Sequence, residues 1–205
     1  MLADMTVSEL LENTAAGTPV PGGGSLSAMA AAVGAALAQM VAGLTAGRKA
    51  FTAVTPEMNE LAEKARRLRT DLLADMDRDA AAYTAVMEAF RLPRETAEEK
   101  SHRTEAIQQA THEATRVPLA VAEKALDVMM LAGTAVAKGN PNAMSDGAVG
   151  AMLARAALQG ALFNVKINLR DIRDKAFAAR LSAEAEALDA RARALETTIL
   201  SHITL

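Results

Sequence analysis

Apolar residues recur at intervals of three and four along most of this chain, which is the spacing of helices that bury one face. Capping residues, prolines and glycines mark where each helix begins and ends. Thr6 or Ser8 precedes the first apolar run, and Thr96 with Glu99 forms a capping box. The predicted helices, each written from its starting signal, are 6–15, 25–46, 55–90, 96–138, 145–170 and 175–199.

Two interruptions of the pattern shape this prediction. Gly17 to Gly24 contains two prolines and three consecutive glycines, so we expect it to be non-helical, with Ser25 capping the next helix. Pro118 falls inside the fourth segment and predicts a kink or a division there. The sequence therefore predicts an all-α fold, a single-domain bundle of long, kinked, mostly antiparallel helices over residues 1–205.

Composition supports helices and excludes several other classes of protein. Alanine accounts for 48 of the 205 residues, and the β-branched and aromatic residues typical of sheets are sparse. There is no cysteine, and the three histidines are widely spaced, so neither a disulfide scaffold nor a metal centre is expected. A net charge of −3 gives no basic field for a nucleic acid.

One segment is long and apolar enough to raise the question of a membrane. No residue from Ser25 to Ala46 is charged, but most are alanine or glycine, and Gln39 lies in the middle. The later run 146–168 is interrupted by Arg155 and Lys166. We therefore expect a buried or interface helix, no membrane association, and a cytoplasmic location, since the N-terminus does not resemble a secretory signal.

A carboxylate interrupts the apolar stripe of the third helix. Asp79 occupies the position between Met76 and Tyr83 where that stripe continues, so its side chain should point into the bundle or a cleft. It is either a core acid paired with a cation or amide, or a carboxylate of raised pKa that moves protons. The three aspartates that precede Asp79 in this helix are expected at the surface: Asp71, Asp75 and Asp77.

Two asparagines interrupt the fifth helix. Asn164 and Asn168 are one turn apart and face the same way, with Gly160 and Ala157 continuing that face. Because buried amides need partners, the pair either joins neighbouring helices or binds the edge of a heterocycle.

The glycine run Pro21–Ser25 is a further candidate site. A glycine run that leads into a helix lets backbone N–H groups approach a ligand, although a tight turn would use the same residues. Arg48 and Lys49 follow the end of that helix, where cations often complement the helix dipole.

Several of these segments together resemble one protein family. They are PVPGGGSLSAMAAAVGAAL, GRKAF, the Asp79–Tyr83 segment with RLP and EEK after it, and NPNAMSDGAVGA followed by FNVKINLRDI. The chain is similar, from about Ser8 to Phe177, to the formimidoyltetrahydrofolate cyclodeaminase and methenyltetrahydrofolate cyclohydrolase family. The resemblance implies an all-helical homodimer that acts on one-carbon forms of tetrahydrofolate, with the folate as substrate and no tightly bound cofactor.

The resemblance also implies roles for individual residues. Catalysis falls on Asp79, which opens the family's Asp-x-x-Ala-Phe/Tyr motif, whereas Ala81 stands where an acid is common and puts in doubt a second carboxylate. Substrate binding falls on the remaining shared positions: Pro21, Gly22, Gly23, Gly24, Ser25, Arg48, Lys49, Tyr83, Asp146, Asn164 and Asn168.

Three functions remain open at this stage. In the first, Asp79 acts as general base on a water that attacks the cationic methenyl bridge, giving the 10-formyl product. Ser25, Asn164 or Asn168 would then hold the pterin or the developing oxygen, and Arg48 and Lys49 the glutamate tail. In the second, the same pocket closes a formimino group and expels ammonia; the first is preferred because no transferase is fused to this chain. The third is a helical interaction module without catalysis.

Overall fold

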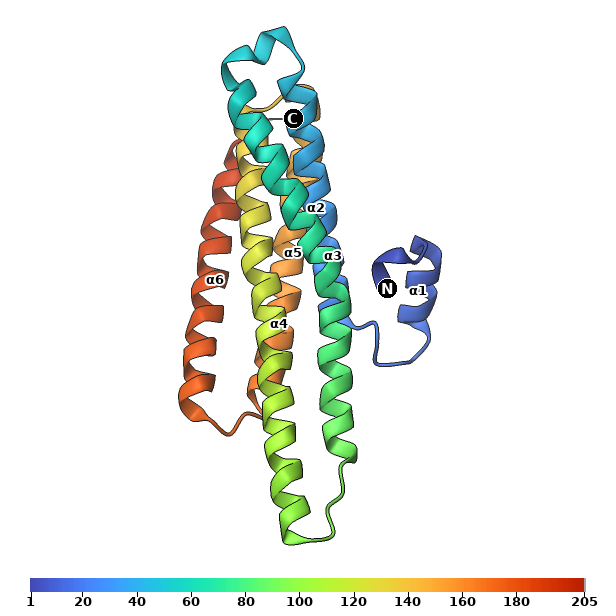
Figure 1. Cartoon of the computed structure of the whole chain (residues 1–205). Helices are drawn as coiled ribbons and strands as arrows, with labels where there is room; N and C mark the ends of the chain where they lie inside the picture. The colour runs from blue at the N-terminus through green and yellow to red at the C-terminus, as the bar shows by residue number, and fades with distance from the viewer. Residues whose placement is uncertain (205) are drawn as a thin grey trace.

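Five long antiparallel helices form an elongated bundle in the structure, a computed structural model that describes residues 1–204 (Figure 1). Within that range every regular element is helical, in agreement with the predicted all-α fold. The long helices are α2 (Gly23–Ala46), α3 (Thr55–Arg91), α4 (Ala97–Lys138), α5 (Met144–Leu169) and α6 (Lys175–Ser201). Short 3-10 turns precede α3 and α5, at Lys49–Val54 and Pro141–Ala143.

The N-terminal segment packs beside the bundle against α3 (Figure 1). It contains a 3-10 turn, Leu2–Asp4, and the short helix α1, Val7–Ala15, which begins with a capping box between Thr6 and Glu9. The Leu2 N–H donates to Asp77 Oδ1 at 2.8 Å. Asp77 is therefore partly covered and holds the N-terminus, whereas the sequence predicted a surface charge there.

The start of α2 differs from the prediction. Gly22 is the N-cap and Gly23 and Gly24 form the first turn, so the glycine run does not exclude a helix and Ser25 is not the cap. Glycine in a helix costs about 1 kcal/mol relative to alanine, which packing can offset. A Cβ at Gly24 would lie 2.5 Å from Asp79 Cγ, so contact with α3 requires a residue without a side chain there.

The other helix boundaries lie close to their predicted positions. The capping box of Thr96 and Glu99 starts α4, and Asp174 caps α6. The caps of α3 and α5 are Val54 and Ala143, one and two residues before the predicted signals. α4 continues through Pro118 as one helix, so the predicted division does not occur.

Small side chains form most of the core. Buried alanines line the contacts between α2, α4 and α5, with Met76, Met129 and Leu158 filling the larger spaces. α2 and α5 cross at Gly34 and Gly150, where a Cβ at Gly34 would lie 2.7 Å from the Gly150 carbonyl oxygen. Because this approach leaves no room for a methyl group, the two helices are held backbone against backbone, and this brings the start of α2 beside the end of α5.

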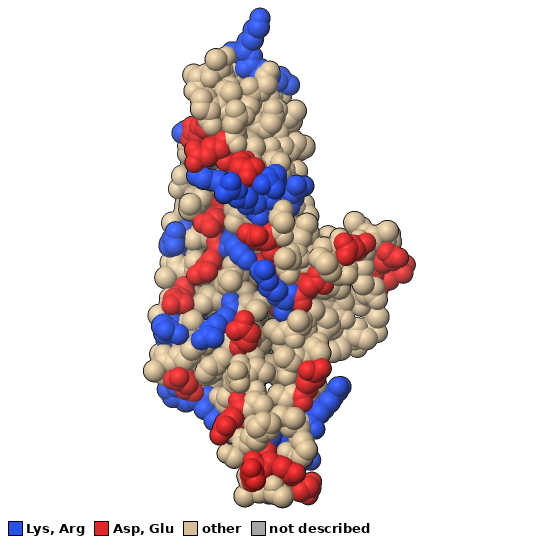
Figure 2. Space-filling model, viewed as in Figure 1, with Lys and Arg blue, Asp and Glu red and all other residues tan. Residues whose placement is uncertain are grey.

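Charged side chains are spread over the side of the bundle formed by α3, α4 and α6 (Figure 2). In contrast, Gly23–Ala46 and Pro141–Leu169 are both long and apolar enough to cross a membrane by length and composition. The sequence pointed only to the first, because Arg155 and Lys166 interrupt the second. About half of each such window is buried inside the bundle, at 50% and 44%.

Candidate active site

A pocket of about 400 Å³ lies at the end of the bundle where α2 begins and α5 ends. The second half of α3 forms one wall, and the loop before α2 forms another. Seven of the residues singled out from the sequence line it: Gly22, Gly23, Gly24, Asp79, Tyr83, Asn164 and Asn168. The structure thus gathers in one cavity most of the residues that interrupt the helical pattern.

Asp79 lies half-buried against the first turn of α2. Its Oδ2 accepts a hydrogen bond from the Ser25 hydroxyl at 2.9 Å. Burial raises the pKa of the Asp79 carboxyl above its usual range, and the hydroxyl and backbone N–H of Ser25 oppose that rise. A carboxylate whose pKa is raised is a stronger base when ionised, as proton abstraction from water requires.

Ser25 can satisfy both protonation states of Asp79. Its hydroxyl is fully buried and lies 3.0 Å from the Met76 carbonyl oxygen as well as 2.9 Å from Asp79 Oδ2. A hydroxyl has one hydrogen, so it donates to Asp79 while the carboxylate is ionised. After Asp79 gains a proton, Ser25 can accept from it and donate to Met76 instead. Ser25 therefore positions Asp79 from behind and does not line the pocket.

The first turn of α2 provides hydrogen-bond donors on the same side of the pocket. The N–H groups of Gly23 and Gly24 have no carbonyl partner within the helix, because the first residues of any helix lack one. They also carry the positive end of the helix dipole. The pocket therefore combines a base with donors suited to an oxygen that develops negative charge.

The two asparagines present acceptors to the pocket. The Nδ2 of Asn164 donates to the Gly160 carbonyl at 2.9 Å, and the Nδ2 of Asn168 donates to the Ala114 carbonyl at 2.7 Å. No donor among residues 1–204 reaches the Oδ1 of either side chain. The Asn168 bond joins α5 to α4, as the first alternative from the sequence expected, whereas the Asn164 bond stays within α5. Each amide keeps an oxygen that can accept from N–H groups of a ligand.

Pro118 explains why the Ala114 carbonyl is available to Asn168. In a regular helix the N–H of residue 118 would bond to the carbonyl of residue 114, but proline has no N–H. The amide of Asn168 takes that place from the neighbouring helix α5. The sequence contains a signal for this role of Ala114. A proline inside a helix leaves the carbonyl four residues before it without its usual donor, so Pro118 points to Ala114.

An apolar wall closes the opposite side of the pocket. Tyr83, Val86, Met87 and Phe90 all project from the last turns of α3. Tyr83 and Phe90 are more than a third exposed. Exposed aromatic and methionine side chains beside a polar floor suit a flat ligand with a polar edge.

Five of the residues assigned to substrate binding do not line this pocket. Pro21 and Ser25 are buried behind it. Arg48, Lys49 and Asp146 belong to the opposite end of the bundle, where the Asn140 N–H donates to Thr45 Oγ1 at 2.9 Å and joins the turn before α5 to the end of α2. The 24 residues of α2 separate the two ends by about 36 Å at 1.5 Å per residue.

Asp75 was expected at the surface, but it is buried. Its carboxylate pairs with Lys124 of α4 and with Arg78, whose Nη1 lies 2.6 Å from Oδ1. The position lies one turn before Asp79 but faces α4 and not the pocket. Helical spacing alone could not reveal this pair, because the cation comes from a different helix. Asp71 is exposed, as predicted.

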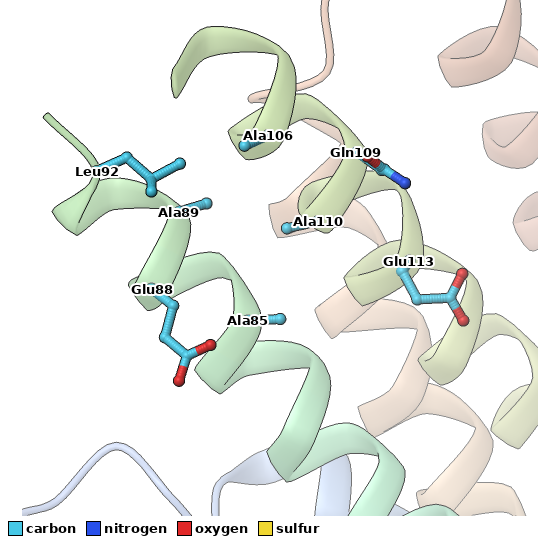
Figure 3. A pocket seen from close by; sticks show the side chains of 8 residues that line it. All are labelled: Ala85, Glu88, Ala89, Leu92, Ala106, Gln109, Ala110 and Glu113. Atoms are coloured by element: carbon cyan, nitrogen blue, oxygen red, sulfur yellow. The ribbon is translucent and has the colours of Figure 1, made fainter. Parts of the chain in front are cut away.

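A groove of similar volume, about 430 Å³, runs between the last turns of α3 and the first half of α4. Figure 3 shows that alanines face each other across it, while Glu88 and Glu113 lie at its rim. It gathers no converging polar groups, so we do not assign chemistry to it. Within residues 1–204, no three His, Asp or Glu side chains are grouped as metal ligands would be.

Comparisons with known proteins agree on one family. A model of the formiminotransferase-cyclodeaminase family matches residues 6–187. The methenyltetrahydrofolate cyclohydrolase of Methylorubrum extorquens is 39% identical over 199 residues, which cover 97% of this chain and 96% of that protein. The formimidoyltransferase-cyclodeaminase of Rattus norvegicus is 36% identical over 176 residues, 86% of this chain but only 32% of that longer protein.

A solved structure supports the same assignment. The crystal structure of formiminotetrahydrofolate cyclodeaminase from Thermotoga maritima matches with a TM-score of 0.89 and 28% sequence identity. The match covers 98% of this chain and 97% of that one. The bundle, including the order of its helices, is therefore shared over nearly the whole length of both chains.

Proposed function

The chain belongs to the formiminotransferase-cyclodeaminase family, and from this membership we propose that it is a methenyltetrahydrofolate cyclohydrolase. Such an enzyme hydrolyses 5,10-methenyltetrahydrofolate to 10-formyltetrahydrofolate. The relative of that name matches along almost its entire length, whereas the chain spans about a third of the bifunctional relatives. The observation that carries the proposal is the half-buried Asp79 carboxylate, held by Ser25 in a pocket with free acceptors and donors.

The reaction begins with attack of water on the bridge carbon. The methenyl bridge between two folate nitrogens is a cationic amidinium, which the ionised Asp79 attracts. Asp79 removes a proton from the water as its oxygen bonds to the bridge carbon, giving a neutral tetrahedral adduct. The N–H groups at the start of α2 stabilise charge that develops on that oxygen.

The second step opens the ring. The bond between the bridge carbon and N5 breaks, the electron pair goes to N5, and N5 takes the proton that Asp79 holds. The hydroxyl proton of the adduct leaves to solvent, so a formyl group remains on N10 and one proton is released overall. Asp79 is ionised again, and Ser25 donates to it as before.

The pterin is held by its polar edge and its flat faces. The Oδ1 atoms of Asn164 and Asn168 accept from pterin N–H groups, and the side chains of Tyr83 and Phe90 cover the ring. We therefore move Ser25 from substrate binding to the positioning of Asp79. Binding roles for Arg48, Lys49 and Asp146 would require a second copy of the chain.

Cyclodeaminase activity is the second candidate, because the solved relative and the bifunctional relatives carry that name. In that reaction the N10 nitrogen would attack the formimino carbon and ammonia would leave, through the same cation. The two activities are separated by supplying each folate and following ammonia release or loss of the methenyl absorbance. Ammonia release without methenyl hydrolysis would overturn the cyclohydrolase assignment.

Replacing Asp79 with Asn tests the catalytic assignment. The amide keeps the shape and the Ser25 contact but cannot take a proton, so we expect hydrolysis to fall by about 10²- to 10⁴-fold. The turnover rate of the wild type should also fall on acidification. The midpoint of that fall should lie above the ordinary pKa range of Asp, because burial raises the pKa of Asp79. Steady-state rates across pH measure both, and near-wild-type turnover by Asp79→Asn would exclude Asp79 as the base.

The proposal includes the setting in which the enzyme works. We infer a cytoplasmic homodimer that binds its folate as substrate, without a tightly bound cofactor and without membrane association. The apolar outer sides of α2 and α5 would then face protein instead of lipid.

A further inference from the structure

We propose that Asp171 is the residue by which the pocket recognises the far end of the pterin ring. Its carboxylate accepts two parallel hydrogen bonds, one from N3–H and one from the 2-amino group. This inference rests on the proposed function, which places the methenyl bridge beside Asp79. Neither the helical pattern of the sequence nor the two steps of the reaction uses Asp171.

Three hydrogen-bond acceptors form a row along one side of the pocket. Asn164, Asn168 and Asp171 all line it, and their spacing of four and three residues places them on one face of α5 and of the turn that follows it. The Asp171 N–H donates to the Asn168 carbonyl at 3.2 Å, so the chain keeps turning in the same direction beyond the last residue of α5. At 1.5 Å per residue the row is about 10 Å long. Its last member is the one that can carry a negative charge.

The row begins beside the proposed base and ends away from it. A Cβ at Gly23 would lie 3.6 Å from Asn164 Nδ2, and a Cβ at Gly24, the next residue, would overlap the Asp79 carboxylate. The first turn of α2 therefore brings Asn164 to the Asp79 end of the pocket. Asp171, two turns further along the chain, occupies the other end of the row.

A pterin with its methenyl bridge at Asp79 extends its pyrimidine ring toward Asp171. The bridge joins N5 to N10, whereas N3 and the 2-amino group lie at the opposite end of the two fused rings. These two nitrogens present parallel N–H bonds, which match the two oxygens of one carboxylate. An asparagine would offer a single oxygen without charge, together with a competing donor. Asp171 therefore has the chemistry that this end of the ring requires.

The Asp171 carboxylate is available for a ligand, while its backbone is held in place. Among residues 1–204 no hydrogen-bond donor or cation contacts its side chain, and the residue is exposed in the pocket lining. Gln108 of α4 holds the turn on both sides: its Nε2 donates to the Asp171 carbonyl at 2.9 Å, and its Oε1 accepts from the Arg173 N–H at 2.7 Å. A side chain on a fixed backbone loses less freedom on binding a ligand.

A structural role does not account for an acid at this position. Asp171 lies two residues beyond Leu169, the end of α5, where the helix dipole favours a cation and disfavours a carboxylate. The cap of the next helix is supplied by Asp174, whose Oδ1 accepts from the first N–H groups of α6. Asp171 thus contributes to neither helix end, and its place in the pocket lining is the contact that remains.

A ligand without the 2-amino group tests the contact directly. 5-Formyltetrahydrofolate carries the same pterin and has no methenyl bridge to hydrolyse, so calorimetry can measure its binding without turnover. Its 2-desamino analogue lacks one of the two N–H partners. We expect the wild type to bind the parent compound about 10- to 100-fold more tightly than the analogue. Asp171→Ala should bind the two nearly equally, because the contact is absent from both complexes.

Two results of this titration would overturn the proposal. The first is an Asp171→Ala variant that keeps the full preference for the 2-amino compound. The second is a wild type that binds both compounds equally or binds neither.

Kinetics with the methenyl compound shows whether Asp171 binds the substrate or takes part in the chemistry. Asp171→Asn should raise KM about 10- to 100-fold, while kcat stays near the wild-type value because Asp79 is unchanged. Asp174→Asn is the matched control: it removes the same charge three residues later and outside the pocket lining, and asparagine still caps α6. Its KM should stay near that of the wild type. Equal rises in KM in the two variants, or a fall in kcat at unchanged KM in Asp171→Asn, would contradict a direct contact with the pterin.

Binding and turnover separate this inference from the proposed function. If the wild type does not hydrolyse the methenyl compound but prefers 5-formyltetrahydrofolate to its analogue through Asp171, the cyclohydrolase assignment fails and the pterin contact holds. If the wild type hydrolyses the methenyl compound and Asp171→Ala keeps the preference, the cyclohydrolase assignment holds and the pterin contact fails.

Discussion

At the scale of single residues, Asp79 can approach α2 because the residue opposite it has no side chain. Gly24 lies in the first turn of α2, and a Cβ there would overlap the Asp79 carboxylate. Gly23, one residue earlier in the same turn, is different: a Cβ at that position would lie 3.6 Å from Asn164 Nδ2, an ordinary contact. The two glycines are adjacent in the sequence, but only at Gly24 would a methyl group overlap another side chain.

This contrast gives a matched pair of variants. Gly24→Ala should displace the carboxylate and lower kcat/KM for methenyl hydrolysis by about 100-fold, since shifts near 1 Å cost that much in catalysis. Gly23→Ala should stay within a few-fold of the wild type. Steady-state kinetics measures the effect, and circular dichroism checks that both variants remain folded. Equal losses in the two variants would contradict the role given to Gly24.

At the scale of helices, Pro118 links the backbone of α4 to the pocket. Its missing N–H leaves the Ala114 carbonyl to Asn168 of α5, whose side chain lines the site. A proline that interrupts a helix therefore serves here to hold an amide in a defined orientation. The helix itself continues without division, since packing against neighbouring helices offsets the loss of one hydrogen bond.

Pro118→Ala should weaken folate binding through Asn168. The new N–H bonds to the Ala114 carbonyl and competes with the Asn168 amide, so KM should rise several-fold while kcat changes less. Asn168→Ala should have a similar effect, and the double variant should be no worse than the single ones, because both changes remove one interaction. Kinetics of the four proteins completes the cycle, and additive losses would show that Pro118 does not act through Asn168.

Signals local to the sequence predicted most of the helices, since a capping box or a proline acts within a few residues. Contacts between helices account for the differences. Gly24 is helical where α3 packs against it through Asp79, and Asp75 is buried because α4 supplies Lys124. Asp79, Asn164 and Asn168 were singled out as interruptions of a pattern, and all three line one pocket. The separation of Arg48 from that pocket could not be predicted from the sequence pattern, because it depends on the length and direction of α2 in the folded bundle.

At the scale of the whole molecule, Asp79 lowers the stability of the protein in order to provide a base. Its pKa is raised in the folded state, so the protonated form is favoured there, and ionisation disfavours folding. The cost is absent below the pKa of Asp in the unfolded chain, about 3.9, and is complete once pH exceeds the pKa of the folded state.

Asp79→Asn should therefore be more stable than the wild type at pH 7 to 8. The amide has no charge to bury and still accepts from Ser25. The gain should shrink as pH falls and vanish below about pH 3, where Asp79 is protonated in both folded and unfolded chains. Urea unfolding of both proteins across pH measures the difference in the free energy of unfolding. A variant that is less stable than the wild type at pH 8 would contradict burial as the cause of the raised pKa.

Tyr83 gives the pocket a spectroscopic label of its own. The chain has one tyrosine and no tryptophan, and that tyrosine lies in the wall of the pocket on α3. Ultraviolet fluorescence excited near 280 nm would thus originate from a single side chain at the site. Energy transfer to a reduced or methenyl folate, which absorbs at longer wavelengths, would quench that emission on binding. The unmodified protein can report its own titration with each folate, without a fluorophore attached.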